Sequence, residues 1–249
     1  MQVYAGPAKS KLCGFSIAND DPVSPLIVTT EQLSGKCRAL FVRRNSSEKL
    51  QVVQSIVIDE TLLSDCVTFA RWPEGNIFCA IYGFDCLHEF SRAPSASSTP
   101  FEDTSRKHPL HNRVRYICGL QSNGECRLAA SFDDNSIRVF RVAAAGDALA
   151  ELQRVTPPQS NWTPYTLVAL PGGSLIVDSL FTDPAKQRQG IECCAAKSDG
   201  TLSSPKRLFS QELGFALWAL QPPTEAFPTY RLIASNDNYE LCLLSIKAQ

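Results

Sequence analysis

Residues able to bind a metal or activate a nucleophile are few in this sequence. His108 and His111 lie three positions apart with no third ligand nearby, whereas a metal site needs clustered ligands. Cys86 and His88 could share one face of a strand, as a cysteine nucleophile and its base would. A chain with ten cysteines produces such a pair by chance, and no glycine-rich phosphate loop or G-x-S-x-G motif occurs. We therefore predict no metal site, no cofactor and no catalytic residue.

Side chains suited to protein recognition are more evident. Arg71, Trp72, Trp162 and Trp218 lie in or beside strand-like segments, and Trp and Arg carry much of the binding energy of protein interfaces. If these segments lie side by side, the four side chains form a partner-binding patch. The alternative is that each tryptophan fills a gap in the core, which we favour for Trp218 and leave open for Trp72 and Trp162.

The elements that would position these residues are strands arranged in a repeat. Short apolar segments recur about every 50 residues, a period typical of repeat architectures. Five of them are present, at 26–30, 77–81, 127–131, 174–178 and 231–235. Each follows another apolar run across a turn-forming cluster and precedes a further strand, which predicts antiparallel hairpins. Because such a unit cannot bury both faces alone, the units must stack. We predict an all-β chain: one β-propeller domain, 1–249, of about five blades with three to four antiparallel strands each.

The third unit carries the most specific motif. Residues 128–140 combine small residues on a strand, the turn Asp133-Asp134-Asn135, and a strand with an aromatic residue, Phe140, near its end. This stretch resembles the core of a WD40 repeat, although Phe140 stands where that family usually has tryptophan. The family's Gly-His and Trp-Asp dipeptides are absent. The resemblance is to a divergent WD40-like propeller and implies a non-catalytic scaffold that binds a protein or peptide within a multiprotein complex.

A propeller enzyme, such as a hydrolase acting on a small molecule or glycan, is the alternative. It would need two or more carboxylates converging at the mouth of the central channel. The segments expected to line that channel contain no Asp or Glu; they are 67–70, 116–119, 167–170 and 216–219. Loop carboxylates such as Asp20, Asp21 and Glu74 stay open as candidates. A sugar-binding lectin ranks last, because the tryptophans do not recur at one repeat position.

Two features bear on the completeness of the ring. The segment 91–113 is rich in Ser, Pro and charge, which predicts a mobile loop where the second unit should have its outer strand. The last unit ends at its third strand, and residues 2–5 could supply a fourth strand that closes the ring. The alternative is an incomplete arc with an exposed edge.

Composition limits the class of partner and the compartment. The net charge is −1 without a long block of one sign, so we expect no nucleic-acid partner. The N-terminus lacks the apolar region of a signal peptide, and no apolar run is long enough for a membrane span. We therefore expect a cytoplasmic or nuclear protein without membrane contact, whose cysteines are reduced.

Overall fold

The structure is a computed structural model and describes most of the chain. The described residues are 11–18, 26–33, 36–58, 67–71, 77–82, 86–92, 100–122, 125–141, 148–156, 159–170, 172–182, 187–208, 216–221, 229–235 and 241–246. Their regular secondary structure consists of β-strands. Within these ranges there is no helix that is long and apolar enough to cross a membrane.

The strands form five antiparallel sheets, which we number as blades 1 to 5. Blade 1 contains β1 (Lys11–Ala18), β2 (Leu26–Leu33), β3 (Lys36–Arg44) and β4 (Leu50–Ile58). Blade 2 contains β5 (Val67–Arg71), β6 (Ile77–Tyr82), β7 (Cys86–Arg92) and β8 (Glu102–Pro109). Blade 3 contains β9 (Val114–Ser122), β10 (Glu125–Phe132), β11 (Ile137–Arg141) and β12 (Ala150–Val155). Blade 4 contains β13 (Trp162–Ala169), β14 (Leu175–Thr182), β15 (Gln187–Cys194) and β16 (Lys206–Arg207). Blade 5 contains β17 (Ala216–Gln221), β18 (Tyr230–Ser235) and β19 (Leu241–Ile246).

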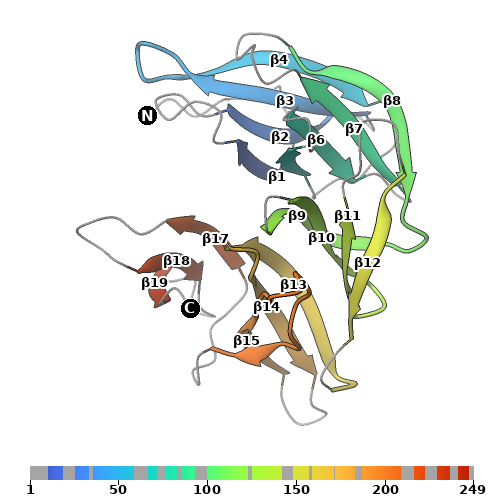
Figure 1. The fold of residues 1–249 in the computed structure, drawn as a ribbon. Helices are drawn as coiled ribbons and strands as arrows, with labels where there is room; N and C mark the ends of the chain where they lie inside the picture. The colour runs from blue at the N-terminus through green and yellow to red at the C-terminus, as the bar shows by residue number, and fades with distance from the viewer. Residues whose placement is uncertain are drawn as a thin grey trace.

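The predicted five-unit repeat is confirmed, and the first strand of each blade lies innermost. Along the chain, β1 packs against β5, β5 against β9, β9 against β13, and β13 against β17. Within each blade the strands follow one another in sequence order, as hairpin connections require. Figure 1 shows the described strands in an open arc, and none of the strands of blade 1 makes extensive contact with a described strand of blade 5. The described strands by themselves form an open arc, and the two alternatives for the ring stay predictions because residues 2–5 lie outside them.

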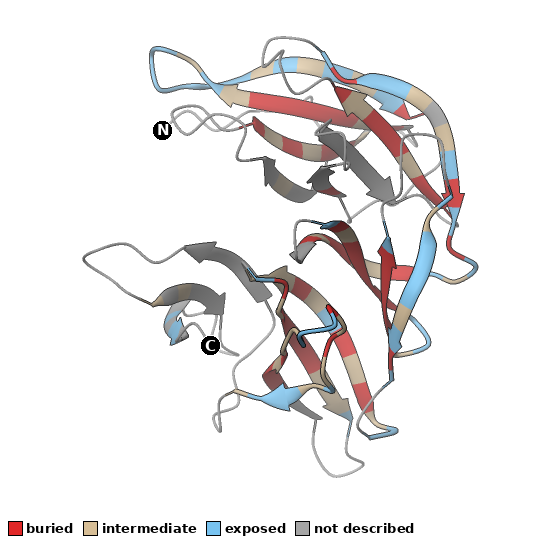
Figure 2. Cartoon of the chain, viewed as in Figure 1, coloured by how far each residue is buried: buried red, intermediate tan, exposed pale blue. Residues whose placement is uncertain are grey.

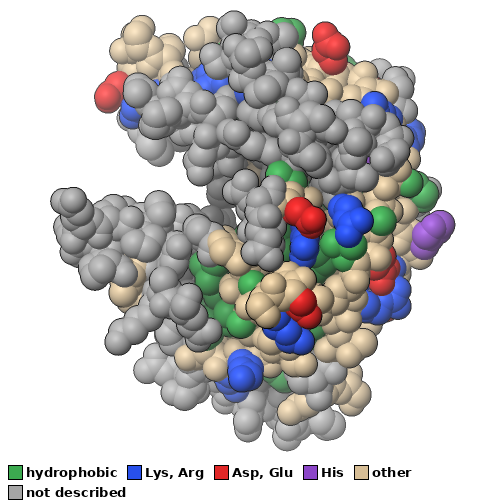
Figure 3. Space-filling model, viewed as in Figure 1, with side chains coloured by type: hydrophobic (Ala, Val, Ile, Leu, Met, Phe, Trp, Pro, Cys, Tyr) green, Lys and Arg blue, Asp and Glu red, His purple; other side chains and the backbone are tan. Residues whose placement is uncertain are grey.

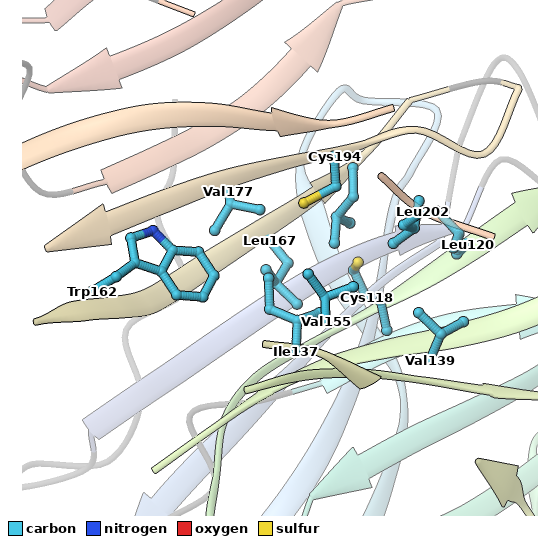
Figure 4. Close-up of a cluster of buried hydrophobic side chains, with 12 residues drawn as sticks. Cys118, Leu120, Ile137, Val139, Val155, Trp162, Leu167, Val177, Cys194 and Leu202 are labelled. Carbon is cyan, nitrogen blue, oxygen red and sulfur yellow. The ribbon is translucent and has the colours of Figure 1, made fainter. Parts of the chain in front are cut away.

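In the described part of the chain, hydrophobic cores lie between blades 1 and 2, blades 2 and 3, and blades 3 and 4. Blades 1 and 2 meet around Phe41, Phe90 and Phe101, and blades 2 and 3 meet around Leu87 and Phe132. A third cluster joins blades 3 and 4, and Figure 4 shows its side chains converging between the two sheets. Burial is concentrated in the middle strands, whereas exposed residues gather on β4, β8 and β12 (Figure 2). Stacking of sheet faces therefore stabilises the arc, as the repeat predicted.

A glutamine on the outer strand joins neighbouring blades in two places. The Gln54 amide donates to the Phe101 carbonyl over 2.6 Å and accepts from the Phe101 N–H over 2.7 Å. Gln153 makes the same pair of bonds to the backbone of Leu202, at 2.8 and 2.7 Å. We call this pair of bonds the glutamine latch. It satisfies backbone groups that precede the outer strand of the next blade, where an unpaired N–H or C=O would be costly.

The prediction of a mobile loop at 91–113 is wrong for much of this segment. Residues 102–109 form β8, which pairs with β7 from Ser91–Glu102 to Cys86–Pro109. A charged, polar sequence suits this strand because it lies at the outer edge of its blade, where charge discourages unwanted pairing. Residues 93–99 lie outside the described residues. So do residues 2–5, which leaves their proposed role in closing the ring as a prediction.

Candidate protein-binding face

The residues predicted to form the patch are not brought together by the described structure. Arg71 ends β5, but its side chain lies outside what the structure describes, as does all of Trp72. Trp218 occupies an irregular position in β17, between Leu217 and Ala219, and only its backbone is described. These three residues stay predictions.

Trp162 is a core residue, and its assignment to a partner-binding surface is wrong. Its side chain is completely buried in the cluster between blades 3 and 4 (Figure 4). The indole Nε1–H donates to Glu192 Oε2 over 2.5 Å, and the Ser179 hydroxyl donates to the same oxygen over 3.0 Å. The alternative from the sequence, that this tryptophan fills a gap between blades, is therefore correct. The indole also satisfies a buried carboxylate that the sequence did not associate with it.

The carboxylate that Trp162 binds belongs to a buried acidic pair in blade 4. Burial raises the pKa of Glu192, although hydrogen bonds from Trp162 and Ser179 and the charge of Arg207 act in the opposite direction. Burial and the nearby charge of Glu192 raise the pKa of Asp178 to about 7. Both residues lie on middle strands and are almost inaccessible to solvent. The sequence analysis looked for carboxylates on the innermost strands, whereas Asp178 lies in β14 and Glu192 in β15.

Histidine and cysteine side chains form local contacts. His108, expected in a mobile loop, lies in β8, where its Nε2 is 2.8 Å from Glu89 Oε2. The Cys86 sulfur lies 3.6 Å from His88 Nε2, so this pair does share a strand face, but Cys86 is buried. Within the described part of the chain, no three His, Cys, Asp or Glu residues are placed to hold a metal ion. Asp20, Asp21 and Glu74 lie outside the described residues.

Two innermost strands, β9 and β13, contain irregularities in their pairing with the next strand of the blade. In β9 an extra residue, Arg115, stands between Tyr116 and Val114, which pair with successive residues of β10. In β13 the pairing with β14 shifts between Pro164 and Leu167, at a matching place. Such bulges bend a strand and re-aim its side chains, and they are frequent at functional sites. The residues at these two irregularities are Arg115 in blade 3 and Tyr165 in blade 4.

Arg115 is held by the turn between β10 and β11. Its Nη1 donates to the Phe132 carbonyl and to Asn135 Oδ1, each over 3.0 Å, and its Nε lies 3.0 Å from Asp133 Oδ1. Asn135 has a φ of 61°, a left-handed conformation that asparagine tolerates well in turns. The Asp-rich turn that the sequence singled out therefore fixes the guanidinium of Arg115 in one orientation.

Tyr165 is the exposed aromatic residue of this face. Its ring lies 5.4 Å from the Arg115 guanidinium carbon, a cation–π distance, and 44 % of the residue is exposed. Its carbonyl accepts a hydrogen bond from the Ser131 hydroxyl over 2.8 Å, so blade 3 also anchors its backbone. The exposed Arg113 lies 3.8 Å from Asp133. We call Arg113, Arg115, Asp133 and Tyr165 the blade 3–4 platform.

The platform combines properties that favour protein recognition. An aromatic ring held by a guanidinium offers apolar area at little cost in side-chain entropy. Figure 3 shows acidic and basic side chains next to one another on blades 3 and 4, with hydrophobic side chains between them. Sequence reasoning missed Tyr165 because nothing local marks a bulge. The one available signal was Pro164, which is unusual inside a strand.

Comparisons with known proteins support the architecture. No family model matches the chain, and no curated protein is found as a relative. Among solved structures, it is similar to the periplasmic gluconolactonase PpgL of Pseudomonas aeruginosa, with 14 % identity, a TM-score of 0.56, and coverage of 94 % of this chain and 70 % of that one. A putative 6-phosphogluconolactonase of Bacteroides uniformis matches with the same identity and coverage and a TM-score of 0.57.

A third similar structure comes from a eukaryote and is not named as a lactonase. It is Sqt1 from Chaetomium thermophilum, with 12 % identity, a TM-score of 0.56, and coverage of 96 % of this chain and 72 % of that one. The similar structures thus include two that are named as lactonases and one that is not. At these identities the likeness concerns the fold alone, and the chain has the fold of a β-propeller.

Proposed function

We propose that this chain is a non-catalytic protein-interaction scaffold, a WD40-like propeller that binds a protein or peptide on one face. The observation that carries the proposal is the blade 3–4 platform, in which Arg115 of one blade orients the exposed Tyr165 of the next. An apolar side chain of the partner would pack on the Tyr165 ring, and an acidic group would approach the exposed Arg113. We place this activity in a cytoplasmic or nuclear complex.

The test compares partners recovered from the native cell by tagged wild-type and variant chains, using quantitative mass spectrometry. Tyr165→Ala removes the exposed ring, and we expect loss of at least one reproducible partner. Leu152→Ala is the matched control, because Leu152 is 36 % exposed on the outer strand β12, away from the platform. If folded Tyr165→Ala retains every partner of the wild type, the platform is not the binding face.

A propeller hydrolase is the second candidate, and one specific observation favours it. Two of the similar structures are those of a gluconolactonase and a putative 6-phosphogluconolactonase. A carboxyl group with a pKa near 7, such as that of Asp178, could act as a general acid at neutral pH. Asp178 is only 4 % exposed, however, so substrate could not reach it without opening blade 4.

A pH-stat assay with gluconolactone and 6-phosphogluconolactone separates the candidates. The scaffold proposal expects hydrolysis at the spontaneous rate with both compounds. A rate that rises with protein concentration and falls in Asp178→Asn would favour the enzyme.

A further inference from the structure

The hairpin turn between β3 and β4 places two arginines and a serine at a defined spacing. Arg43 and Arg44 end β3, and Ser46 lies two positions beyond the second arginine. Among the described serine and threonine residues, Ser46 is the one that has arginine at both the second and the third position before it. One large class of serine/threonine kinases selects this pattern, because carboxylates in the substrate groove of the kinase pair with both guanidinium groups.

The tip of this hairpin is accessible to a large partner. Ser46, Ser47 and Arg44 are exposed, and Arg43 is half-buried. Figure 1 shows the hairpin projecting beyond the other described strands of blade 1, and Figure 2 shows its tip as exposed. Exposed loop tips with small polar residues are the places where modifying and cleaving enzymes most readily reach a folded chain. The Ser46 hydroxyl is therefore positioned for an enzyme that acts on the folded protein.

The turn is shaped by Asn45 and can open locally. Asn45 Oδ1 accepts hydrogen bonds from the backbone N–H groups of Ser47 and Lys49, each over 3.0 Å, and both bonds are exposed to solvent. The Asn45 N–H donates to the Lys49 carbonyl over 2.9 Å and closes the hairpin. Glu48 has a φ of 59°, a left-handed conformation that costs free energy for a residue with a side chain. Exposed hydrogen bonds and a strained residue favour local opening, which lets a kinase extend the segment.

We propose that Ser46 is a phosphorylation site for a serine/threonine kinase that recognises arginine. The kinase would bind Arg43 and Arg44 and transfer the γ-phosphoryl group of ATP to Ser46 Oγ. The Oγ–P bond forms, the bond from the γ-phosphorus to the β–γ bridging oxygen breaks, and the hydroxyl proton passes to the catalytic carboxylate of the kinase as ADP leaves. The product adds about two negative charges at the tip of blade 1. The proposal rests on the cytoplasmic or nuclear location proposed above, but it is independent of the blade 3–4 platform.

The test incubates the full-length chain with Mg-ATP and an arginine-directed kinase, the catalytic subunit of the cyclic-AMP-dependent kinase, and locates phosphate by tandem mass spectrometry. The wild-type chain should gain a single phosphate, on Ser46, and Ser46→Ala should gain none. Arg43→Gln/Arg44→Gln should lower the rate of incorporation by about tenfold or more, because charge-assisted contacts to the kinase are lost. Ser47→Ala is the matched control and should be phosphorylated like the wild type. Circular dichroism checks that every variant is folded.

Other outcomes would overturn the proposal. A folded wild-type chain that takes up no phosphate contradicts it, and phosphorylation of a peptide of residues 41–50 under the same conditions would show that the fold withholds the site. Unchanged incorporation in Ser46→Ala or in the double-arginine variant also contradicts it. In the chain recovered from native cells treated with phosphatase inhibitors, phosphate on Ser46 supports the proposal and its absence refutes it. A glycan on Asn45 refutes it as well, because the triplet Asn45-Ser46-Ser47 is an acceptor for N-glycosylation in secreted proteins.

Discussion

Replacing Trp162 with phenylalanine should destabilise the fold without touching a binding surface. The variant keeps a ring in the core between blades 3 and 4 but loses the 2.5 Å hydrogen bond to Glu192. Loss of a hydrogen bond to a charged group costs about 1.5–3 kcal/mol. The smaller ring adds the cost of a partly filled cavity, roughly 1 kcal/mol. We expect the free energy of unfolding to fall by about 2–4 kcal/mol.

Thermal and urea denaturation of purified wild type and variant measure this loss. For a chain of this size, about 2–4 kcal/mol corresponds to a drop in Tm of roughly 4–16 °C. Glu192→Gln supplies the control in a double-mutant cycle, because a neutral amide depends less on the indole donor. Trp162→Phe should therefore lower the free energy of unfolding by less in the Glu192→Gln background than in the wild-type chain. The argument fails if Trp162→Phe leaves Tm unchanged.

Three further predictions concern polar groups at defined positions. Gln153→Leu leaves the Leu202 N–H and C=O without partners, and urea denaturation should show a loss of about 1–3 kcal/mol; an unchanged midpoint would mean that the latch contributes nothing. The folded-state pKa of Asp178, about 7, lies above its ordinary value of 3.8, so the folded chain holds an extra proton between these values. Stability should thus fall as pH rises through that window and then level off, and Asp178→Asn should make this slope shallower while Asp199→Asn leaves it intact. Partial burial alone would raise the pKa of Asp134, but hydrogen bonds from Ser136 and Arg138 outweigh it and lower the pKa to about 2. The stabilisation is therefore present above about pH 4 and lost as pH falls towards 2, and acid titration of Asp134→Asn should show a smaller decline than the wild type.

The repeat was predictable because it depends on local patterns. Each blade places an apolar second strand between two turns, and hydrophobic spacing and turn residues report this directly. The β10–β11 turn at Asp133–Asn135 was correct for the same reason: its geometry is encoded within three residues. The outer strand β8 was missed because edge strands need little apolar sequence. Its polar residues gain order from pairing with β7, which no local pattern reveals.

The candidate site was harder to predict, because it depends on contacts between blades. The sequence left open whether Trp162 lies on the surface or in the core, because its partner Glu192 is thirty residues away. Tyr165 looked like one more residue of a strand, and only the bulge in β13 and the position of Arg115 distinguish it. Sequence spacing can place residues on strands, but it does not reveal which neighbouring blade satisfies their polar groups.

The position of the blade 3–4 platform links stability to binding. Arg115 belongs to β9 and Tyr165 to β13. A partner that contacts these two residues would therefore span the interface between blades 3 and 4, whose core contains Trp162. Such a partner binds only when the two blades are packed, and it must therefore stabilise that packing by mass action. A bound peptide should raise the Tm of the wild-type chain and slow exchange of the amides of β9 and β13. In Trp162→Phe the same peptide should bind more weakly although no contacting residue has changed, because part of its binding energy would be used to restore the interface.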